Sequence, residues 1–439
     1  MQGSKLDPAM TPPGATASRF SPPSDPQLLL VAAALVLGVY DFLGVGGFGF
    51  GHGFEMAAVA QSLAEHGMYA NPFQPAMTGP TALVPPLFPF LLAGLIRILR
   101  QPTLIVIAAV CLNIATDAFI AWLLPRLSVA FYGTYKPGIV AAVLWLFSMR
   151  LMPQWDLSLT IAGLLSFCLI SRTAVMRGRM ALTAGAGLLG GMVLLANPAT
   201  VSVIALWMVF LFVAYRPGWP QALRQTAAMS LVAILCLAPW LVRNYRTWHA
   251  IVLRTSFGIT LYSSNNDCAS SSLLKERRSG CFQAMHPVDS APEAAILRQM
   301  GEVPYDRLRK GEAIAWIRSH PARFAQLTAS RFVEFWFPDP NAYWLRCYVI
   351  WAITLLSLPG IVLMLRHGQR IAFFILGVWL IYPPVYYVMV SIDRYRYPIL
   401  WTSLLPAGYF LAWLSERRWP RVPASSPPAQ ASTVTALPV

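Results

Sequence analysis

Charged side chains are scarce in this 439-residue sequence, and acidic ones are scarcer than basic ones. Asp, Glu, Lys and Arg make up 12% of the residues, hydrophobic residues make up 56%, and the mean hydropathy is +0.55. A water-soluble chain of this length has no interior large enough to hide so much apolar surface. The composition therefore excludes a soluble globular protein and predicts a helical protein that crosses a membrane several times.

The sequence also lacks the motifs by which soluble enzymes are usually identified. It contains no P-loop, no dinucleotide-binding fingerprint, no zinc-ligand spacing and no nucleophile elbow. Its histidines, cysteines and carboxylates are too scattered to form a recognisable ligand set, so neither a metal nor a cofactor is expected. The glycine-rich segment 44–55 follows an apolar run where a phosphate cradle would need a strand, which favours a flexible loop.

Cysteine is too rare, at six residues, for a disulfide scaffold. Cys268 and Cys281 share one long polar loop and can pair if that loop faces an oxidising compartment, so the sequence leaves this pairing open. The remaining cysteines lie in or beside apolar runs and are expected to pack there: Cys111, Cys168, Cys236 and Cys347.

Basic residues outnumber acidic ones by 33 to 18, for a net charge of +15. They occur as short groups beside apolar segments and do not form a stripe on a soluble domain. This distribution follows the positive-inside rule of membrane proteins. Membrane lipid is therefore the expected partner, and nucleic acid is not.

Ten apolar runs are long enough, or nearly so, to span a membrane. They cover residues 27–45, 103–124, 136–151, 156–173, 181–195, 198–215, 226–243, 347–365, 371–390 and 397–415.

The run Leu83–Leu99 is ambiguous, because it is short for a span and prolines interrupt it early. If it spans, a group of arginines faces outward against the usual charge bias: Arg172, Arg177, Arg179, Arg216 and Arg224. If it lies along the outer surface, those arginines become cytoplasmic. We therefore expect an all-α bundle of about ten spans with both termini in the cytoplasm.

This topology divides the chain into one transmembrane domain, residues 27–418, and two disordered cytoplasmic tails, residues 1–26 and 419–439. The first tail has no apolar segment close behind a charged start, so it is not a cleavable signal peptide. The expected external segments are a first loop 46–102, a large loop 245–346, and short turns at Trp155–Asp156, Asn197–Pro198 and Asp393–Arg396. Amphipathic helices are expected at 55–66 and, as a pair broken at Pro321, at 312–335.

Several segments share their residues and their order with one family. They are EMAAVAQSLAEHGMY (55–69), PPLFPFLLA (85–93), WDLSLT (155–160), LLANPAT (194–200), APWLVRNYRTW (238–248), LYSSNN (261–266), EAIAWIRSHPARFAQLTASRFVEFW (312–336) and RYRYPILWTSLLPAGY (394–409). Together these segments resemble the GT-C membrane glycosyltransferases, specifically the protein O-mannosyltransferase and aminoarabinose transferase branch. The resemblance covers most of the chain and implies a GT-C-type transmembrane bundle with a large external loop.

The resemblance also implies a reaction. Such enzymes take a sugar from a polyprenyl-phosphate donor and transfer it, with inversion, to an acceptor hydroxyl outside the membrane. An acidic residue in the first loop accepts the hydroxyl proton, and basic groups stabilise the departing phosphate. For this chain the resemblance implies a bacterial inner-membrane enzyme with a periplasmic acceptor.

The first loop departs from the pattern of the family. The family usually places an Asp closely followed by Glu or Asp, whereas this chain has His52, two uncharged residues and Glu55. The base is then Glu55, His52 or absent, and we favour Glu55. A carboxylate at the first position of a helix is also explained by the helix dipole alone.

Other acidic residues have both a functional and a structural explanation. Asp156 matches an acidic residue that the family often places after its third span, and it is equally well placed as an N-cap. Asp41, near the end of the first span, lines the same cavity or is an interfacial residue. Asp117 lies in mid-membrane one turn after Asn113, where a structural hydrogen-bonded pair is the first explanation.

Basic and amide side chains at the external span ends are candidates for binding the donor. Arg243, Arg246, Arg394 and Arg396 flank external span ends, and arginine suits bidentate phosphate recognition; Arg394 or Arg396 is favoured for the lipid phosphate, against ordinary interfacial snorkelling. Asn265 and Asn266 match the family's loop motif and are candidates for sugar contacts, although a tight turn explains them equally well. The aromatic groups at Trp336, Trp344, Tyr386 and Tyr387 are expected mostly at the membrane interface, with one or two of them as candidates for stacking on a sugar.

Two other functions are compatible with a polytopic bundle. A transporter or flippase predicts inverted repeats and charged residues along a path, of which the sequence shows only Asp117. A catalytically inactive relative that binds a lipid-linked sugar is compatible with the missing family Asp.

Overall fold

The computed structural model describes residues 25–44, 55–74, 76–149, 151–152, 155–214, 218–340 and 344–418. His52 therefore lies outside the described residues, as do nearly all of the segment 1–26 and the whole of 419–439.

The described residues are α-helical and contain no β-strand, as the sequence predicts. The apolar helices are α1 (Asp25–Gly44), α3 (Leu87–Leu99), α4 (Pro102–Tyr132), α5 (Lys136–Ser148), α6 (Leu157–Arg177), α7 (Met180–Ala196), α8 (Val201–Ala214), α9 (Trp219–Trp248), α16 (Trp344–Arg366), α17 (Ile371–Ile381) and α19 (Tyr397–Arg418). Five of them, α1, α4, α6, α9 and α16, are long and apolar enough to cross a membrane. This is the fold of an integral membrane protein.

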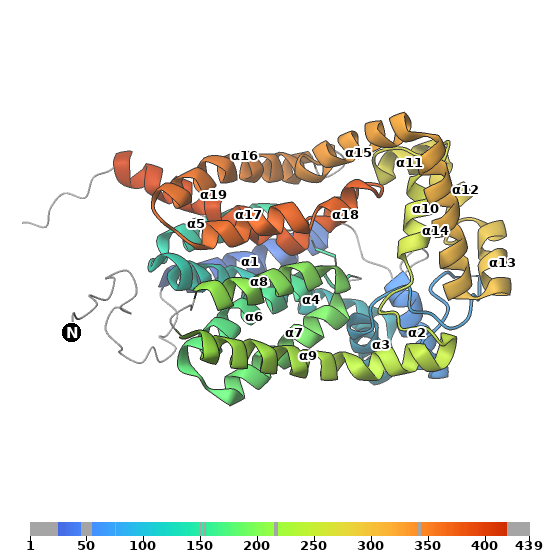
Figure 1. Ribbon diagram of the computed structural model, residues 1–439, viewed down its shortest axis with the longest axis horizontal. Helices are drawn as coiled ribbons and strands as arrows, with labels where there is room; N and C mark the ends of the chain where they lie inside the picture. The colour runs from blue at the N-terminus through green and yellow to red at the C-terminus, as the bar shows by residue number, and fades with distance from the viewer. Residues whose placement is uncertain are drawn as a thin grey trace, which may run out of the picture.

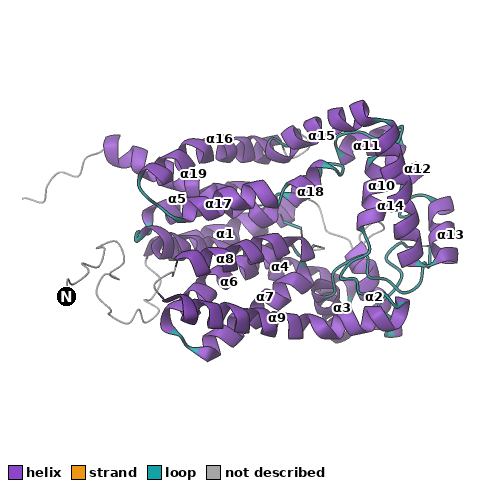
Figure 2. Ribbon diagram, viewed as in Figure 1, coloured by secondary structure: helices purple, strands orange, loops and turns teal. Residues whose placement is uncertain are grey.

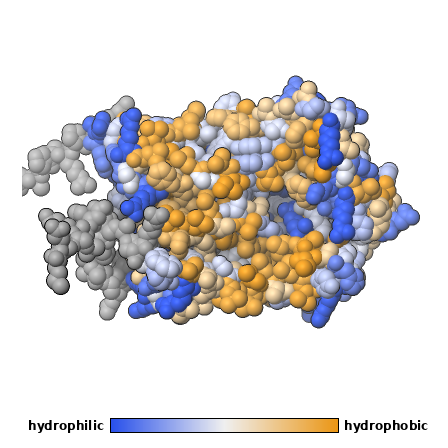
Figure 3. Space-filling model, viewed as in Figure 1, coloured by the Kyte–Doolittle hydropathy of each residue, from blue (hydrophilic) through white to orange (hydrophobic). Residues whose placement is uncertain are grey.

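The apolar helices lie side by side as a bundle, and the helices of the large loop cover one end of it (Figure 1). We call this end the loop end. Among the packed pairs are α6 with α7, α7 with α9, α5 with α19, and α16 with α19. Figure 2 shows the connecting loops gathered at the ends of the helices. In Figure 3 the visible face of the bundle is hydrophobic between two hydrophilic ends, which is the surface that a bilayer requires.

Tryptophans from separate helices fill the bundle core. Trp145 of α5, Trp207 of α8 and Trp401 of α19 are all fully buried. The Trp207 indole donates a hydrogen bond to Ser171 Oγ at 2.8 Å, and the Trp145 indole donates to the Asp117 carbonyl at 3.2 Å. Main-chain and hydroxyl oxygens thus satisfy two polar groups that lipid cannot.

Small residues let the helices around α19 approach one another closely. A side chain added at Gly360 of α16 would collide with the carbonyl oxygen of Pro406, and one at Gly408 would collide with that of Pro137. Glycine at such crossings gives membrane helices the van der Waals contact that holds them together.

The ambiguous run forms α3, which packs against α2 (Glu55–His66). The predicted bounds of α2 are confirmed. α3 has 13 residues, so it is about 20 Å long, less than the roughly 30 Å of a hydrocarbon core. At its C-terminal end, Arg97 donates hydrogen bonds to the carbonyl oxygens of Leu63 and Ala64.

The large loop folds into a helical layer of α10 (Phe257–Ser264), α11 (Leu273–Ser279), α12 (Cys281–Met285), α13 (Ala291–Met300), α14 (Glu302–Ser319) and α15 (Pro321–Trp336). The break between the two longest helices falls at Pro321, as predicted, because proline occupies the first turn of α15.

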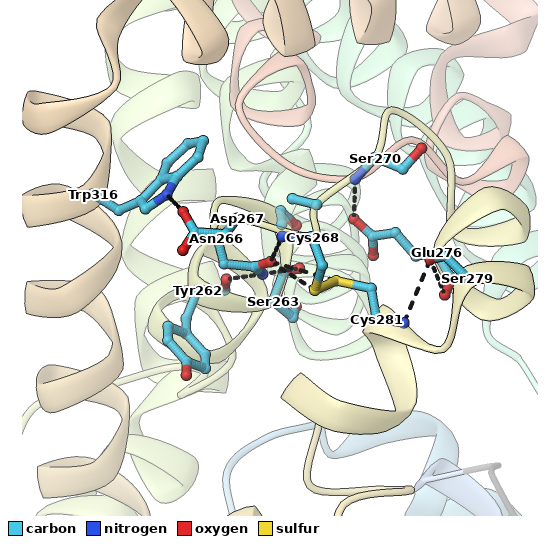
Figure 4. Close-up of a disulfide and its surroundings, with 12 residues drawn as sticks. Tyr262, Ser263, Asn266, Asp267, Cys268, Ser270, Glu276, Ser279, Cys281 and Trp316 are labelled. Carbon is cyan, nitrogen blue, oxygen red and sulfur yellow. Dashed lines mark hydrogen bonds between the residues drawn. A yellow bond between two sulfur atoms is a disulfide. The ribbon is translucent and has the colours of Figure 1, made fainter.

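A disulfide links Cys268 to Cys281 within this layer (Figure 4). Asn266 Oδ1 accepts a hydrogen bond from the Cys268 amide at 3.1 Å, and the Trp316 indole donates to Asp267 at 2.7 Å. The pairing that the sequence leaves open is therefore present, and it fixes the segment between α10 and α12.

Candidate functional site

A polar cavity lies at the loop end, where turns from three parts of the bundle converge. It is lined by Asp156 before α6, Asn197 after α7, and Arg394 of the short helix η4 (Asp393–Tyr395). The large loop closes it with Arg254 and Ser256. Its volume is about 230 Å³.

A second cavity of about 110 Å³ adjoins the first and contains Glu55. Both cavities are lined by Trp155, Arg254, Ser256, Thr260, Arg394 and Tyr395. We refer to the two cavities together as the polar cleft. Segments that are distant in the sequence therefore place the two predicted catalytic carboxylates, Glu55 and Asp156, on one cleft.

Glu55 is the first residue of α2, and its half-buried side chain lines the smaller cavity. Burial raises the pKa of its carboxyl group above the ordinary 4.5, and the positive charges of Arg394, Arg254 and Arg277 oppose that rise. A raised pKa makes the carboxylate a stronger base, while the arginines keep an ionised form accessible.

Asp156 occupies the N-cap position of α6, but its side chain does not cap the helix backbone. Its Oδ2 accepts a hydrogen bond from the Thr160 hydroxyl at 2.9 Å. Burial raises the pKa of this carboxyl group too, with smaller opposing effects that include Arg254 and Arg394. Asp156 therefore precedes α6 without capping it, and its carboxyl group lines the cleft.

The guanidinium groups of Arg254 and Arg394 act on both carboxyl groups, because their positive charges oppose the rise in pKa of each. The Arg394 guanidinium lies over the indole of Trp155, with 3.6 Å between its Cζ and the ring centroid. Arg254 donates from Nε to the Leu83 carbonyl at 2.7 Å, which fixes its side chain against the first loop. Arginines anchored by stacking and by a backbone contact are suited to binding a phosphate.

His286 lines the same cavity as Glu55 but adds no positive charge. Its ring stacks on Phe282 with 4.7 Å between centroids, and Nδ1 accepts a hydrogen bond from the Val288 amide. Burial, with the charges of Arg277 and Arg394, lowers the pKa of His286 to about 3. The positive charge of the cleft therefore comes from arginine.

Tyrosines form one wall of the larger cavity. Tyr386 stacks on Tyr395 with 4.6 Å between ring centroids, and the Tyr382 hydroxyl donates to the Tyr395 carbonyl at 3.1 Å. Tyr386 is one of the aromatic residues predicted mostly for the membrane interface. In the structure it is buried and faces the cleft, because the chain turns back between α17 and η4. Aromatic faces beside hydroxyl groups are surfaces on which sugar rings stack.

The structure places Arg243 and Arg396 outside the polar cleft. Arg243 donates to the carbonyl oxygens of Thr81 at 2.7 Å and Tyr69 at 2.9 Å, and it lines an apolar cavity between α3 and α9. Arg396 is buried and donates to the Trp336 carbonyl at 2.6 Å.

The candidate polar residues Asp41, Asn265 and Asn266 are likewise engaged elsewhere in the protein. Asp41 forms an ion pair with Arg346 of α16. Asn265 donates to the Leu261 and Val388 carbonyls, and Asn266 donates to carbonyls of α10. None of the three lines the polar cleft within the described part of the chain.

The mid-membrane polar residues form a small network. Asn113 donates to Ser158 Oγ at 3.3 Å, and its Oδ1 accepts a hydrogen bond from the Met152 amide at 3.3 Å. Asn113 therefore bonds to Ser158 of α6 and to the Met152 main chain, while the Asp117 side chain is buried one turn away.

Sequence reasoning missed Arg254 and Arg277. Both lie in the large loop, where no motif or periodicity marks them. Asn197 and Trp155 fall inside segments of the resemblance, but their residue types alone indicate no role for either. Among the described residues, no group of three or more His, Cys, Asp or Glu side chains is arranged to hold a metal ion.

The fold is similar to that of solved archaeal oligosaccharyltransferases. One is AglB from Archaeoglobus fulgidus in complex with an inhibitory peptide and a dolichol-phosphate, with a TM-score of 0.53 and 13% identity over 90% of this chain. Another is an oligosaccharyltransferase of the same organism in complex with Zn and sulfate, with a TM-score of 0.54 and 14% identity over 90% of this chain.

This chain spans about half the length of those two structures, 51% and 49% respectively. At such low identity the similarity establishes a shared fold. No protein-family model matches the sequence, and no curated protein matches it either.

Proposed function

We propose that this protein is a membrane glycosyltransferase that moves a sugar from a polyprenyl-phosphate donor to a periplasmic acceptor hydroxyl, at the outer face of a bacterial inner membrane. The observation that supports this most directly is the polar cleft, where two carboxylates with raised pKa values face two anchored arginines. The fold shared with oligosaccharyltransferases supports the same reaction class.

In the proposed reaction, the Glu55 carboxylate accepts the proton of the acceptor hydroxyl. The acceptor oxygen attacks the anomeric carbon from the side opposite the phosphate, and the new C–O bond forms with inversion. The bond between the anomeric carbon and the phosphate oxygen breaks, and polyprenyl phosphate leaves with the electron pair. Arg254 and Arg394 stabilise its negative charge, and Asp156 orients the sugar or acceptor.

The rim of the polar cleft suits a lipid-linked donor. Apolar side chains from α18 (Pro384–Tyr387) and its surroundings line the larger cavity, among them Val385, Met389 and Phe257. Figure 3 shows hydrophilic residues in a recess where the hydrophobic surface of the bundle meets the large loop. A donor with its phosphate at the arginines would leave its polyprenyl chain beside this apolar surface.

Two observations support the outward orientation of the loop end. The Cys268–Cys281 disulfide belongs to an oxidising compartment such as the periplasm. In a ten-span topology with α3 at the outer surface, the basic groups between the apolar helices lie at the opposite, cytoplasmic end.

Donor binding tests the role of the cleft arginines. We expect Arg394→Ala to weaken binding of polyprenyl-phosphate sugars by about tenfold or more, because charged hydrogen bonds to the phosphate are lost. Native mass spectrometry of the reconstituted protein would measure this. The matched control is Arg246→Ala, which removes an exposed arginine at the end of α9. Equal binding by wild type and both variants would contradict the proposed site.

A further inference from the structure

A buried carboxylate outside the polar cleft joins two segments that form its walls. Glu302, in the first turn of α14, is 4% exposed. One of its oxygens accepts hydrogen bonds from the Ala82 amide, at 2.6 Å, and from the Thr255 hydroxyl. The other accepts a hydrogen bond from the Thr81 hydroxyl. One side chain therefore holds the first external loop and the start of the large loop together.

The residues next to these partners line the cleft. Leu83 and Val84 follow Ala82 and line the cavity that contains Glu55. Arg254 precedes Thr255 and lines both cavities. Displacing either segment would therefore move a wall of the cleft.

Further hydrogen bonds connect the same two segments directly. The Thr255 amide donates to the Ala82 carbonyl at 3.1 Å, and Arg254 donates to the Leu83 carbonyl at 2.7 Å. The Leu83 amide donates to Thr81 Oγ1 at 2.9 Å. Glu302 lies behind this small network, so losing its carboxylate would leave Thr81, Ala82 and Thr255 with buried polar groups unpaired.

α14 also holds the next part of the wall. Asp306, one turn after Glu302, accepts hydrogen bonds from the Gly258 amide at 2.7 Å and the Ile259 amide at 3.2 Å. A side chain at Gly258 would collide with the Asp306 carbonyl, so the two backbones are in close contact. α14 is thus the support on which the segment 254–260 rests, and Glu302 extends that support to the first loop.

We propose that Glu302 is a positioning residue for the transfer reaction, which fixes Arg254 and the wall at residues 83–84 relative to Glu55. This inference rests on the proposed function. Glu302 does not line either cavity, so it acts through Arg254 and touches no substrate. A loosened guanidinium would still bind phosphate but would stabilise the departing charge less well.

Two substitutions separate positioning from proton transfer. Glu302→Ala removes all three hydrogen bonds. Glu302→Gln retains an oxygen for the Ala82 amide and the Thr255 hydroxyl, and its amide can donate to Thr81. We expect turnover per donor-binding site to fall by about ten- to a hundredfold in Glu302→Ala and to stay within about threefold of wild type in Glu302→Gln. The matched control is Glu293→Gln, a buried carboxylate whose partners, Tyr305 and Arg309, line neither cavity.

Hydrogen exchange tests the same inference without any substrate. In full-length protein reconstituted in lipid, Glu302→Ala should exchange faster at residues 80–85 and 253–260, with the bundle helices unchanged. Glu302→Gln and Glu293→Gln should leave both segments as in wild type. Unchanged exchange of both segments in Glu302→Ala would overturn the inference, as would a Glu302→Gln protein as inactive as Glu302→Ala. If wild type turns over no donor, the proposed function fails, and the exchange result alone decides whether Glu302 holds the walls.

Discussion

At the scale of single residues, the surroundings of Glu55 and Asp156 change the acidity of their carboxyl groups. Each has an ordinary structural role, as the first residue of α2 and as the N-cap residue of α6. The catalytic roles proposed for them depend on two features: burial, which raises the pKa of both, and the shared arginines Arg254 and Arg394, which keep an ionised form accessible.

The raised pKa of Glu55 predicts a pH dependence. A general base acts only when deprotonated, so turnover should fall as the pH drops through the pKa of Glu55. Because that pKa lies above 4.5, the acid limb should lie at a higher pH than for an exposed carboxylate. Arg254→Ala removes a positive charge that lowers the pKa of Glu55, so it should move the acid limb to a still higher pH. A pH profile of kcat would test this, and a limb that stays in place in Arg254→Ala would contradict it.

The sequence predicts some residues of the cleft and not others, for a physical reason. Glu55 and Asp156 lie at the starts of helices whose apolar patterns are recognisable in the sequence, so the positions of both residues in the fold can be predicted. Arg254 lies in an irregular segment whose neighbouring residues, Thr255 and Gly258, hydrogen-bond to α14. Asn265 lies in a segment that resembles a loop motif of the GT-C enzymes, yet both of its donors bond carbonyl groups of the protein.

At the scale of elements, helix boundaries are predicted well where a single residue favours the start of a helix. α2 begins at Glu55, and α15 begins at Pro321, where the pyrrolidine ring suits a first helical turn. The short helices α11 (Leu273–Ser279) and α12 (Cys281–Met285) were not foreseen, because segments of seven and five residues carry too few turns to show a helical period.

The disulfide of the large loop gives a prediction at this scale. Its cysteines are 13 residues apart, and closing a loop of that size stabilises a fold by about 3 kcal/mol. Cys281→Ser should therefore lower the melting temperature of the large loop, measured by scanning fluorimetry. Reductant should lower the wild-type value similarly and leave the variant unchanged. A wild-type protein that melts at the same temperature with and without reductant would contradict the pairing.

At the scale of the whole molecule, composition predicts the bundle, because 56% hydrophobic residues leave few alternatives to a membrane. Composition does not predict which helices pack together, such as α5 with α19, because most apolar helices are compatible with many neighbours. The convergence of the turns at Asp156, Asn197 and Arg394 follows from that packing.

The proposed ten-span topology predicts the location of Arg100, an exposed residue at the end of α3. If α3 lies at the outer surface, Arg100→Cys should react with a membrane-impermeant maleimide in intact cells. The control is Arg366→Cys at the end of α16, which should react only after permeabilisation. Both variants would carry Cys111→Ser, because Cys111 is exposed. Protection of Arg100→Cys in intact cells would show that α3 spans the membrane.

The most direct test of the proposed glycosyltransferase is release of free polyprenyl phosphate from a panel of polyprenyl-phosphate sugars. Wild type and Glu55→Gln would be reconstituted in lipid with native membranes as the source of acceptors. The proposal predicts release by wild type from at least one donor, and a loss of about a hundredfold or more in the variant, which still binds that donor. Donor binding without release by wild type would contradict the proposal and favour a lipid-linked-sugar-binding protein.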